Sequence, residues 1–340
     1  MSKIYEALRQ AELDRGKSGA TGFDPESNSQ TTSQAVLEEA PAHVSAFSNS
    51  GRALATLIPV PKANSKVVPA PSTDSEIAVV GVADADLELS DADLAKIPHV
   101  SWNPSIAQLP ALEERGAAVE QFRSLRSRMQ EFRDLNEIKS ILVSSGIPQE
   151  GKSFITANLA ISIARHKAGR VLLIDGDMRR ATLHKLLGCP QGPGLTEYLS
   201  GSASLVEIMQ RPSVSEPGSP LPSGLASLTF IPAGTEHDKA ADLSGNHRFE
   251  RLIAAASPHF DWIVVDSSPV NLVSDGVNLA RACDAVLLVA RGGVTKYEIA
   301  QRAVSELKAS KVLGFVLNAV EKPPVAGGYY GYDGYDKIEG

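Results

Sequence analysis

One stretch decides the fold: Ile141-Leu142-Val143-Ser144-Ser145-Gly146-Ile147-Pro148-Gln149-Glu150-Gly151-Lys152-Ser153. A short apolar run rich in β-branched residues stops at Gly146, and Gly151-Lys152-Ser153 follows five residues later. The apolar spacing then becomes helical, so the order is strand, G-x-x-x-x-G-K-S loop and helix. A phosphate-binding loop requires a strand before it and a helix after it. The alternative, a glycine turn followed by Lys-Ser by chance, would not require either element.

The residue types in this loop suit an anionic ligand. Backbone N–H groups in the turn and at the start of the helix favour an anion at one point. Gly146 and Gly151 let the backbone approach the ligand closely. Lys152 supplies a positive charge for the outer phosphates, and the Ser153 hydroxyl can ligate magnesium. The expected nucleotide-binding residues of this segment are Gly146, Ile147, Pro148, Gln149, Glu150, Gly151, Lys152, Ser153 and Phe154.

Composition and charge exclude several classes of protein. Hydrophobic residues make up 43% of the 340 residues, enough for one core built from about 200–240 residues. Two cysteines are too few for a disulfide framework. No apolar run approaches the roughly 20 residues that span a bilayer, and no signal-peptide pattern follows Met1, so a cytoplasmic location is expected. A net charge of −7 argues against general nucleic-acid binding.

The N-terminal part of the chain differs in composition from the rest. Residues 1–15 have helical apolar spacing, and a helix this short either frays or docks on a partner. Residues 16–105 are rich in Ser, Thr, Asn, Ala and Pro, and residues 17–100 carry eleven acidic and five basic side chains. Such a segment buries too little apolar surface to offset its ordering entropy, so a disordered acidic linker is predicted.

Residues 106–322 are predicted to form one α/β domain. After the loop, strands are expected at Arg170–Asp175, Leu228–Ala233, Trp262–Asp266, Ala285–Ala290 and Val312–Leu317. Helices are expected between them at Ser153–His166, His247–Ser257, Asp275–Ala282 and Thr295–Ala309. Continuous apolar strands that alternate with helices predict a doubly wound, mostly parallel sheet covered on both faces. The proline-rich stretch Arg211–Gly224 is predicted to be a surface loop.

Two of the predicted strands end in acidic residues. One runs into Asp175-Gly176-Asp177, and another runs into Asp266-Ser267-Ser268-Pro269. In a doubly wound sheet the ligand lies beyond the carboxyl ends of the strands. Acids placed there can hold magnesium or accept a proton from an attacking hydroxyl group, although one such Asp alone is more simply a helix N-cap. Two of them beside a phosphate loop favour the catalytic interpretation.

A helix with a buried apolar stripe is expected near residues 112–132, because its apolar residues recur at spacings of three and four. Glu120, Arg123 and Arg126 step by three and lie on a separate face. On its own this pattern indicates a solvated face, with one Glu–Arg pair that stabilises the helix by a few tenths of a kcal/mol at about 25 °C.

Together these motifs resemble the bacterial tyrosine kinases of exopolysaccharide synthesis, in particular their soluble tyrosine-autokinase branch. The loop is similar to the family's Ser-rich, Pro-Gly-Glu-Gly-Lys-Ser form. Residues 175–180, followed by His184, resemble its second acidic motif, and residues 266–269 are similar to its Asp-(Ser/Thr)-Pro-Pro motif. Residues 120–126 resemble its E-x-x-R-x-x-R self-association motif. The resemblance covers the chain from about Ala111 onward.

The resemblance implies transfer of the γ-phosphoryl group of ATP to tyrosine, largely on the protein itself, in a domain related to the partitioning ATPases. Asp175 would accept the tyrosine proton, and Asn318, at the end of the last strand, would face the adenine. The implied catalytic residues are Lys152, Asp175 and Asp177, and the implied Mg²⁺ ligands are Ser153, Asp177 and Asp266.

The same resemblance implies partners. Glu120, Arg123 and Arg126 would form the contact of a transient, ring-like homo-oligomer. A membrane protein that controls polysaccharide chain length or export is expected to be the activator and to grip residues 1–15. That contact would recruit the chain peripherally to the inner membrane. A tyrosine phosphatase is expected to reverse the modification.

The C-terminal segment 323–340 is rich in glycine and tyrosine. Its glycines and lack of apolar partners predict an exposed, flexible tail, which is either adhesive without chemistry or a phosphoryl acceptor. A phosphoryl-transfer site on the same chain favours the acceptor, and full phosphorylation would add about −6 to −8 charges. Four of the seven tyrosines lie here: Tyr329, Tyr330, Tyr332 and Tyr335.

Two departures from the family pattern leave alternatives open. Gln149 stands where the family usually has glycine, although the backbone there need not have a positive φ. Ser268 replaces a proline after Asp266, and neither change removes a charged group. A partitioning-type ATPase is one alternative, but it would carry an extra lysine at the position of Ile147. A non-catalytic, nucleotide-gated scaffold is the other, and Gln149 is its best support.

Overall fold

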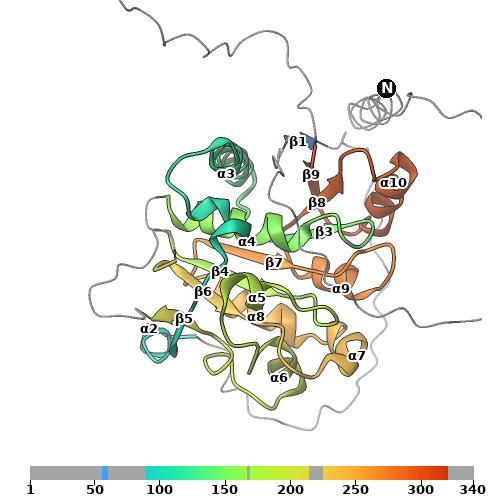
Figure 1. Cartoon of the computed structure of the whole chain (residues 1–340). Coiled ribbons are helices and arrows are strands. Elements are labelled where there is room, and N and C mark those ends of the chain that lie inside the picture. The colour runs from blue at the N-terminus through green and yellow to red at the C-terminus, as the bar shows by residue number, and fades with distance from the viewer. Residues whose placement is uncertain (1–55, 60–88, 167–168, 214–224, 321–340) are drawn as a thin grey trace, which may run out of the picture.

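A seven-stranded sheet forms the centre of the fold (Figure 1). The computed structural model describes residues 56–59, 89–166, 169–213 and 225–320. The strand order is β1-β9-β8-β3-β7-β4-β6, and all neighbouring strands are parallel except β1 and β9. The strands are β1 (Thr56–Pro59), β3 (Ser140–Ser145), β4 (Val171–Asp175), β6 (Leu228–Ile231), β7 (Trp262–Asp266), β8 (Ala285–Arg291) and β9 (Val312–Asn318). The predicted doubly wound, mostly parallel sheet is confirmed.

Helices cover both faces of the sheet (Figure 1). One face packs against η3 (Pro110–Leu112), α3 (Ala117–Asn136), α4 (Lys152–Ala164) and α5 (Leu183–Leu187), and the exposed turn η2 (Ile106–Gln108) precedes η3. The other face packs against α6 (Leu195–Ser200), α7 (Ala240–Ser244), α8 (Arg248–Ala256), α9 (Asp275–Arg281) and α10 (Tyr297–Glu306). A further short turn, η4 (His237–Lys239), precedes α7.

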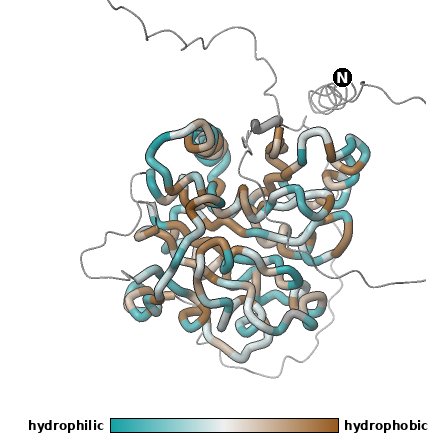
Figure 2. Tube along the Cα trace, viewed as in Figure 1, coloured by the Kyte–Doolittle hydropathy of each residue, from teal (hydrophilic) through white to brown (hydrophobic). Residues whose placement is uncertain are grey.

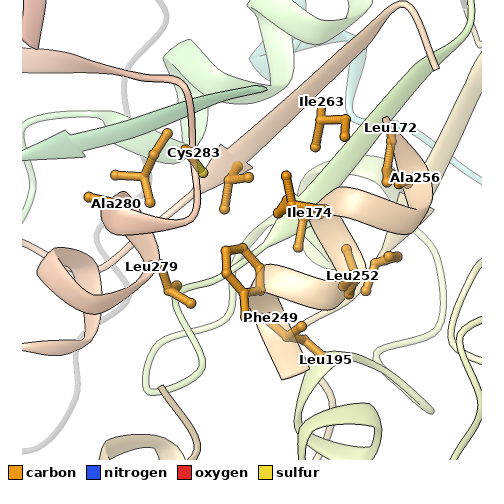
Figure 3. Close-up of a cluster of buried hydrophobic side chains, with 14 of the residues drawn as sticks. Leu172, Ile174, Leu195, Phe249, Leu252, Ala256, Ile263, Leu279, Ala280 and Cys283 are labelled. Carbon is orange, nitrogen blue, oxygen red and sulfur yellow. The ribbon is translucent and has the colours of Figure 1, made fainter. Parts of the chain in front are cut away.

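The strands are apolar on both faces because both are covered. Successive side chains of a strand point to opposite sides. Leu172 and Ile174 of β4 therefore enter the core that α8 and α9 close, whereas Leu173 enters the core under α3 and α4. Figure 3 shows the first core, where Phe249 of α8 lies beside Ile174 of β4. In Figure 2 the hydrophobic residues are concentrated along the central strands.

Helices and strands occur inside the predicted linker. The linker was expected to extend to residue 105, but residues 89–105 contain α2 (Asp91–Leu94) and β2 (His99–Ser101). Ser90 caps α2 with a capping box, and Trp102 is buried against Phe230, with ring centroids 6.1 Å apart. The expected linker is therefore wrong for these residues, because their apolar partners lie far away in the sequence. It is also wrong for Thr56–Pro59, which form β1 and pair with β9.

A second correction concerns the predicted surface loop Arg211–Gly224. Its first residues form β5 (Arg211–Ser213), which pairs in parallel with β2. Prolines favour loops, but Pro212 lies in a two-stranded ribbon whose strands both have an open edge, where a missing N–H donor is tolerated. The segments 1–15 and 323–340, and most of residues 16–88, lie outside the described residues.

Candidate active site

The phosphate-binding loop joins β3 to α4, and two of its glycines are required by close neighbours. A Cβ at Gly146 would lie 2.7 Å from the side chain of Ile299 on α10. Gly151 has φ +90° and caps α4, and a Cβ there would collide with Asn318. From the sequence, both glycines are expected to let the backbone approach a ligand closely. The structure shows that they also leave room for the side chains of Ile299 and Asn318.

A buried carboxylate holds the loop in shape. Glu150 is 1% exposed, and its Oε2 accepts a hydrogen bond from the Ile147 N–H at 2.9 Å. Thr295, between β8 and α10, donates its hydroxyl to the other oxygen of Glu150. Asn318 Nδ2 donates to the Glu150 carbonyl at 3.0 Å. The predicted adenine contact Asn318 thus touches the backbone of the loop, and Glu150 acts as a positioning residue that the motif alone does not reveal.

Gln149 has a left-handed backbone, with φ +64°. The expectation that this position need not have a positive φ is therefore wrong. A side chain in this conformation costs about 1–2 kcal/mol relative to the right-handed region. Gln149 is exposed, so no packing contact offsets that cost.

We expect Gln149→Gly to raise the free energy of unfolding by up to about 1 kcal/mol, since the greater unfolded-state entropy of glycine removes part of the gain. Urea denaturation of the nucleotide-free protein measures this difference. Gln149→Ala is the matched control, because it shortens the side chain and retains the Cβ. If both variants raised the free energy of unfolding equally, the left-handed backbone of residue 149 would not be the cause of the increase.

The acidic strand ends converge on the loop. β4 and β7 are neighbours, and their register places Asp175 opposite Asp266. Lys152 Nζ lies 3.9 Å from Asp177 Oδ2, and both side chains are buried. The Ser153 hydroxyl donates to Asp266 Oδ2 at 2.5 Å. The five predicted catalytic and metal-binding residues therefore lie together at the carboxyl edge of the sheet.

Burial dominates the electrostatics of the three aspartates. It raises the pKa of Asp175 well above its usual range, and the charges of Asp266 and Asp177 raise it further. It raises the pKa of Asp266 to about 6, against the opposing effects of the Lys152 charge and the Ser153 hydroxyl. Burial also raises the pKa of Asp177, which Lys152 partly opposes. The site therefore carries more carboxylate groups than its own cations neutralise.

These groups fit a magnesium–nucleotide ligand. Asp175 Oδ2 accepts hydrogen bonds from the N–H groups of Thr182 and Leu183, while its buried Oδ1 has no partner among the described residues. Carboxylate and hydroxyl oxygens are the ligands that Mg²⁺ prefers, completed by phosphate oxygens and waters. In the described part of the chain, no cluster of three or more His, Cys, Asp or Glu side chains is arranged to hold a metal alone.

We expect the buried Asp266 to make the nucleotide-free protein less stable at neutral than at mildly acidic pH. Its folded-state pKa is about 6, above the usual 3.8. The folded state therefore binds the proton more tightly, so the cost of the charge is fully present above about pH 6 and shrinks as the pH falls from about 6 toward the usual 3.8. Urea denaturation should show Asp266→Asn stabilised over the native chain by about 1–3 kcal/mol at pH 7.5, with a smaller gap at pH 5. If the difference in stability between Asp266→Asn and the native chain did not change with pH, the raised pKa of Asp266 would be contradicted.

Two residues near the site point away from the phosphates. Phe154 packs edge-on against Phe122 of α3, with ring centroids 5.8 Å apart, so only its backbone lies at the loop. Arg179, in the second acidic motif, donates its Nε to the buried Asp275 at 2.5 Å. Asp275 begins α9, so this ion pair ties the loop after β4 to the opposite side of the site.

The predicted self-association residues differ in exposure. Glu120 and Arg123 form an exposed ion pair on α3. Arg126 is half-buried and donates its Nη1 to the Ser162 carbonyl of α4 at 3.0 Å. The guanidinium of Arg126 therefore turns toward α4, while Glu120 and Arg123 are more exposed. The four predicted acceptor tyrosines lie outside the described residues.

The sequence of the chain is similar to those of several bacterial tyrosine-protein kinases. The chain is 32% identical over 207 residues to the tyrosine-protein kinase ptk of Acinetobacter johnsonii, covering 60% of this chain but only 27% of that protein. It is 33% identical over 218 residues to the tyrosine-protein kinase CpsD of Streptococcus agalactiae, covering 62% of this chain and 88% of that protein.

Solved structures agree with these sequence matches. The kinase domain of the Escherichia coli tyrosine kinase ETK superposes with a TM-score of 0.59 at 28% identity, over 74% of this chain and 93% of that domain. No family model matches the chain. Within the described residues, no helix combines the length and the apolar character needed to cross a lipid bilayer.

Proposed function

The chain belongs to the bacterial tyrosine kinases, and from this premise we propose that it transfers the γ-phosphoryl group of ATP to tyrosines of its own C-terminal segment. The observation that carries this proposal is the convergence of Lys152, Ser153 and three aspartates at the end of the sheet. Such a constellation suits a phosphoryl group with a metal ion, because it pairs one buried cation with several oxygen donors.

Each side chain has a distinct role in the proposed reaction. Lys152 and the loop amides hold the outer phosphates of ATP. Ser153, Asp177 and Asp266 would provide oxygens to hold Mg²⁺, which would neutralise phosphate charge and orient the triphosphate. The loop keeps this geometry through Glu150, which Thr295 and Ile147 hold in place.

Asp175 is the proposed proton acceptor. The phenol oxygen forms a bond to the γ-phosphorus, the bond from that phosphorus to the β,γ-bridging oxygen breaks, and the phenol proton passes to Asp175. The products are ADP and phosphotyrosine. A carboxylate whose pKa is raised by burial suits this role, since efficient proton transfer favours a pKa near the working pH.

Assembly and partners complete the proposal. Unmodified tails dock in the sites of neighbouring subunits of a transient ring, with Glu120, Arg123 and Arg126 at the subunit contact. Phosphorylated tails repel one another and release the ring. A membrane protein of polysaccharide synthesis or export activates the chain through residues 1–15, a tyrosine phosphatase resets it, and the cycle regulates exopolysaccharide production.

Phosphopeptide mapping tests the proposed acceptor segment. The purified full chain is first treated with a phosphatase, which is then removed, and incubated with Mg²⁺ and ATP; tandem mass spectrometry then locates phosphotyrosine. We expect most of it at Tyr329, Tyr330, Tyr332 and Tyr335, so replacing these four by phenylalanine should lower total phosphotyrosine by about tenfold or more. Tyr5→Phe is the matched control and should leave the total nearly unchanged. Phosphotyrosine that persists in the fourfold variant would place the acceptor elsewhere.

A further inference from the structure

A basic pocket lies between α3 and the C-terminal end of α4, away from the phosphate-binding loop. Its volume is about 280 Å³, and its lining includes Arg123, Arg126, Arg165 and His166. At liquid density this volume holds about nine water molecules, so a phosphate group fits in it. Lys152 begins α4 and Arg165 follows its end, and a helix of 13 residues is about 20 Å long. The pocket is therefore distinct from the candidate active site.

The pocket holds an excess of positive charge. Among the described residues, three guanidinium groups line it and no acidic side chain does. Glu120 pairs with Arg123, but this ion pair is exposed, with the Glu120 side chain 63% accessible, and it contributes little in solvent. The C-terminal end of α4 contributes only about −0.5 of a charge. An anion in the pocket would thus relieve repulsion among the arginines.

Arg126 has an unused hydrogen-bond donor beside this pocket. Its Nη1 donates to the Ser162 carbonyl, while its buried Nε has no hydrogen-bond partner among the described residues. Burial, followed by the charges of Arg123 and Arg165, holds the pKa of this guanidinium below its usual range. A guanidinium presents its N–H donors in a fixed planar fork, which matches the oxygens of a phosphate or carboxylate.

We propose that this pocket binds a phosphate monoester dianion and that its ligand is a phosphorylated tyrosine of residues 327–336. This inference rests on the proposed function, which supplies the modified tail. A phosphotyrosine carries about −1.5 to −2 charges and three acceptor oxygens, which match several converging arginines. The sequence around the tail tyrosines adds Asp333 and Asp336, so the phosphorylated segment is strongly acidic.

Occupation of the pocket would also affect assembly. Arg123 and Arg126 belong to the proposed subunit contact, so a phosphate held by them competes with that contact. The pocket would then turn phosphorylation into release of the ring by direct competition, in addition to repulsion between tails. Arg165 also donates hydrogen bonds to the carbonyls of Ala111 and Glu113 and so supports the fold. Its substitution is therefore less suited to testing ligand binding in the pocket.

Isothermal titration calorimetry tests the pocket without relying on kinase activity. The full chain is dephosphorylated and saturated with Mg²⁺ and ADP, so that the phosphate-binding loop is filled. It is titrated with a peptide of residues 327–336 phosphorylated at Tyr332, with the same peptide unphosphorylated, and with inorganic phosphate. We expect the phosphopeptide to bind at least tenfold more tightly than either of the other ligands.

Matched arginine variants locate the binding. Arg126→Gln should weaken phosphopeptide binding by about tenfold or more, since a charge-assisted hydrogen bond is lost. Arg128→Gln, on an exposed part of the same helix, should change it less than twofold. Arg123→Gln keeps the test valid if Arg126→Gln fails to fold. Equal effects of the Arg126 and Arg128 variants would overturn the site, and equal binding of inorganic phosphate and phosphopeptide would overturn the tail as its ligand.

Discussion

Replacing Lys152 with methionine should lower the rate of tyrosine phosphorylation by about a hundredfold to a thousandfold or more. Lys152 is buried at the start of α4, and its ammonium group lies 3.9 Å from Asp177. Methionine retains most of the volume and removes the buried cation that faces Asp177. Loss of a preorganised charge in a site from which water is excluded has effects of this size. Quantitative phosphotyrosine detection after incubation with Mg²⁺ and ATP measures the rate.

The control for this variant is Lys308→Met. Lys308 is exposed and follows α10, so its loss should leave the rate nearly unchanged. Circular dichroism establishes that both variants are folded. If Lys152→Met retained more than about a tenth of the native rate while losing nucleotide affinity, Lys152 would bind the ground state only, and its proposed role in the transition state would be wrong.

Replacing Asp175 with asparagine should lower the transfer rate by about 10²- to 10⁴-fold, the usual contribution of a general base. Asparagine keeps an oxygen that can accept from the N–H groups of Thr182 and Leu183, so the loop after β4 should keep its shape. The affinity for Mg²⁺–ADP should change less than about threefold, because the proposed metal ligands are other side chains. Single-turnover kinetics separates the two quantities.

The matched control is Asp242→Asn, at an exposed position of α7. The dependence of the rate on pH gives a further test. In the native chain the rate should fall at acidic pH as Asp175 becomes protonated, and Asp175→Asn should remove that dependence. If Asp177→Asn removes it and Asp175→Asn does not, Asp177 is the proton acceptor.

Local sequence was sufficient for much of the fold and for the core of the site. The strand–loop–helix pattern around Lys152 depends on residues close together in the chain, and so does each acidic strand end. Their convergence followed from one general rule, that parallel strands present their carboxyl ends at the same edge. The register of Asp175 with Asp266 agrees with that rule.

Features that depend on distant residues were not predicted. Glu150 is held by Thr295, 145 residues away, and nothing near either residue reveals the pair. β2 and β5 form a ribbon although each stretch is polar or proline-containing, because Trp102 and Phe230 pack beside it. The left-handed backbone of Gln149 and the turn of Arg126 toward α4 also depend on tertiary packing.

The most direct test of the central claim compares two products of the same reaction. The dephosphorylated, phosphatase-free full chain is incubated with Mg²⁺ and ATP labelled in the γ-phosphoryl group, and phosphotyrosine and free phosphate are measured at early times. The proposed kinase should form phosphotyrosine on the chain at least as fast as it releases phosphate, and Lys152→Met should form neither. Steady release of phosphate without phosphotyrosine would contradict the account and indicate an ATPase.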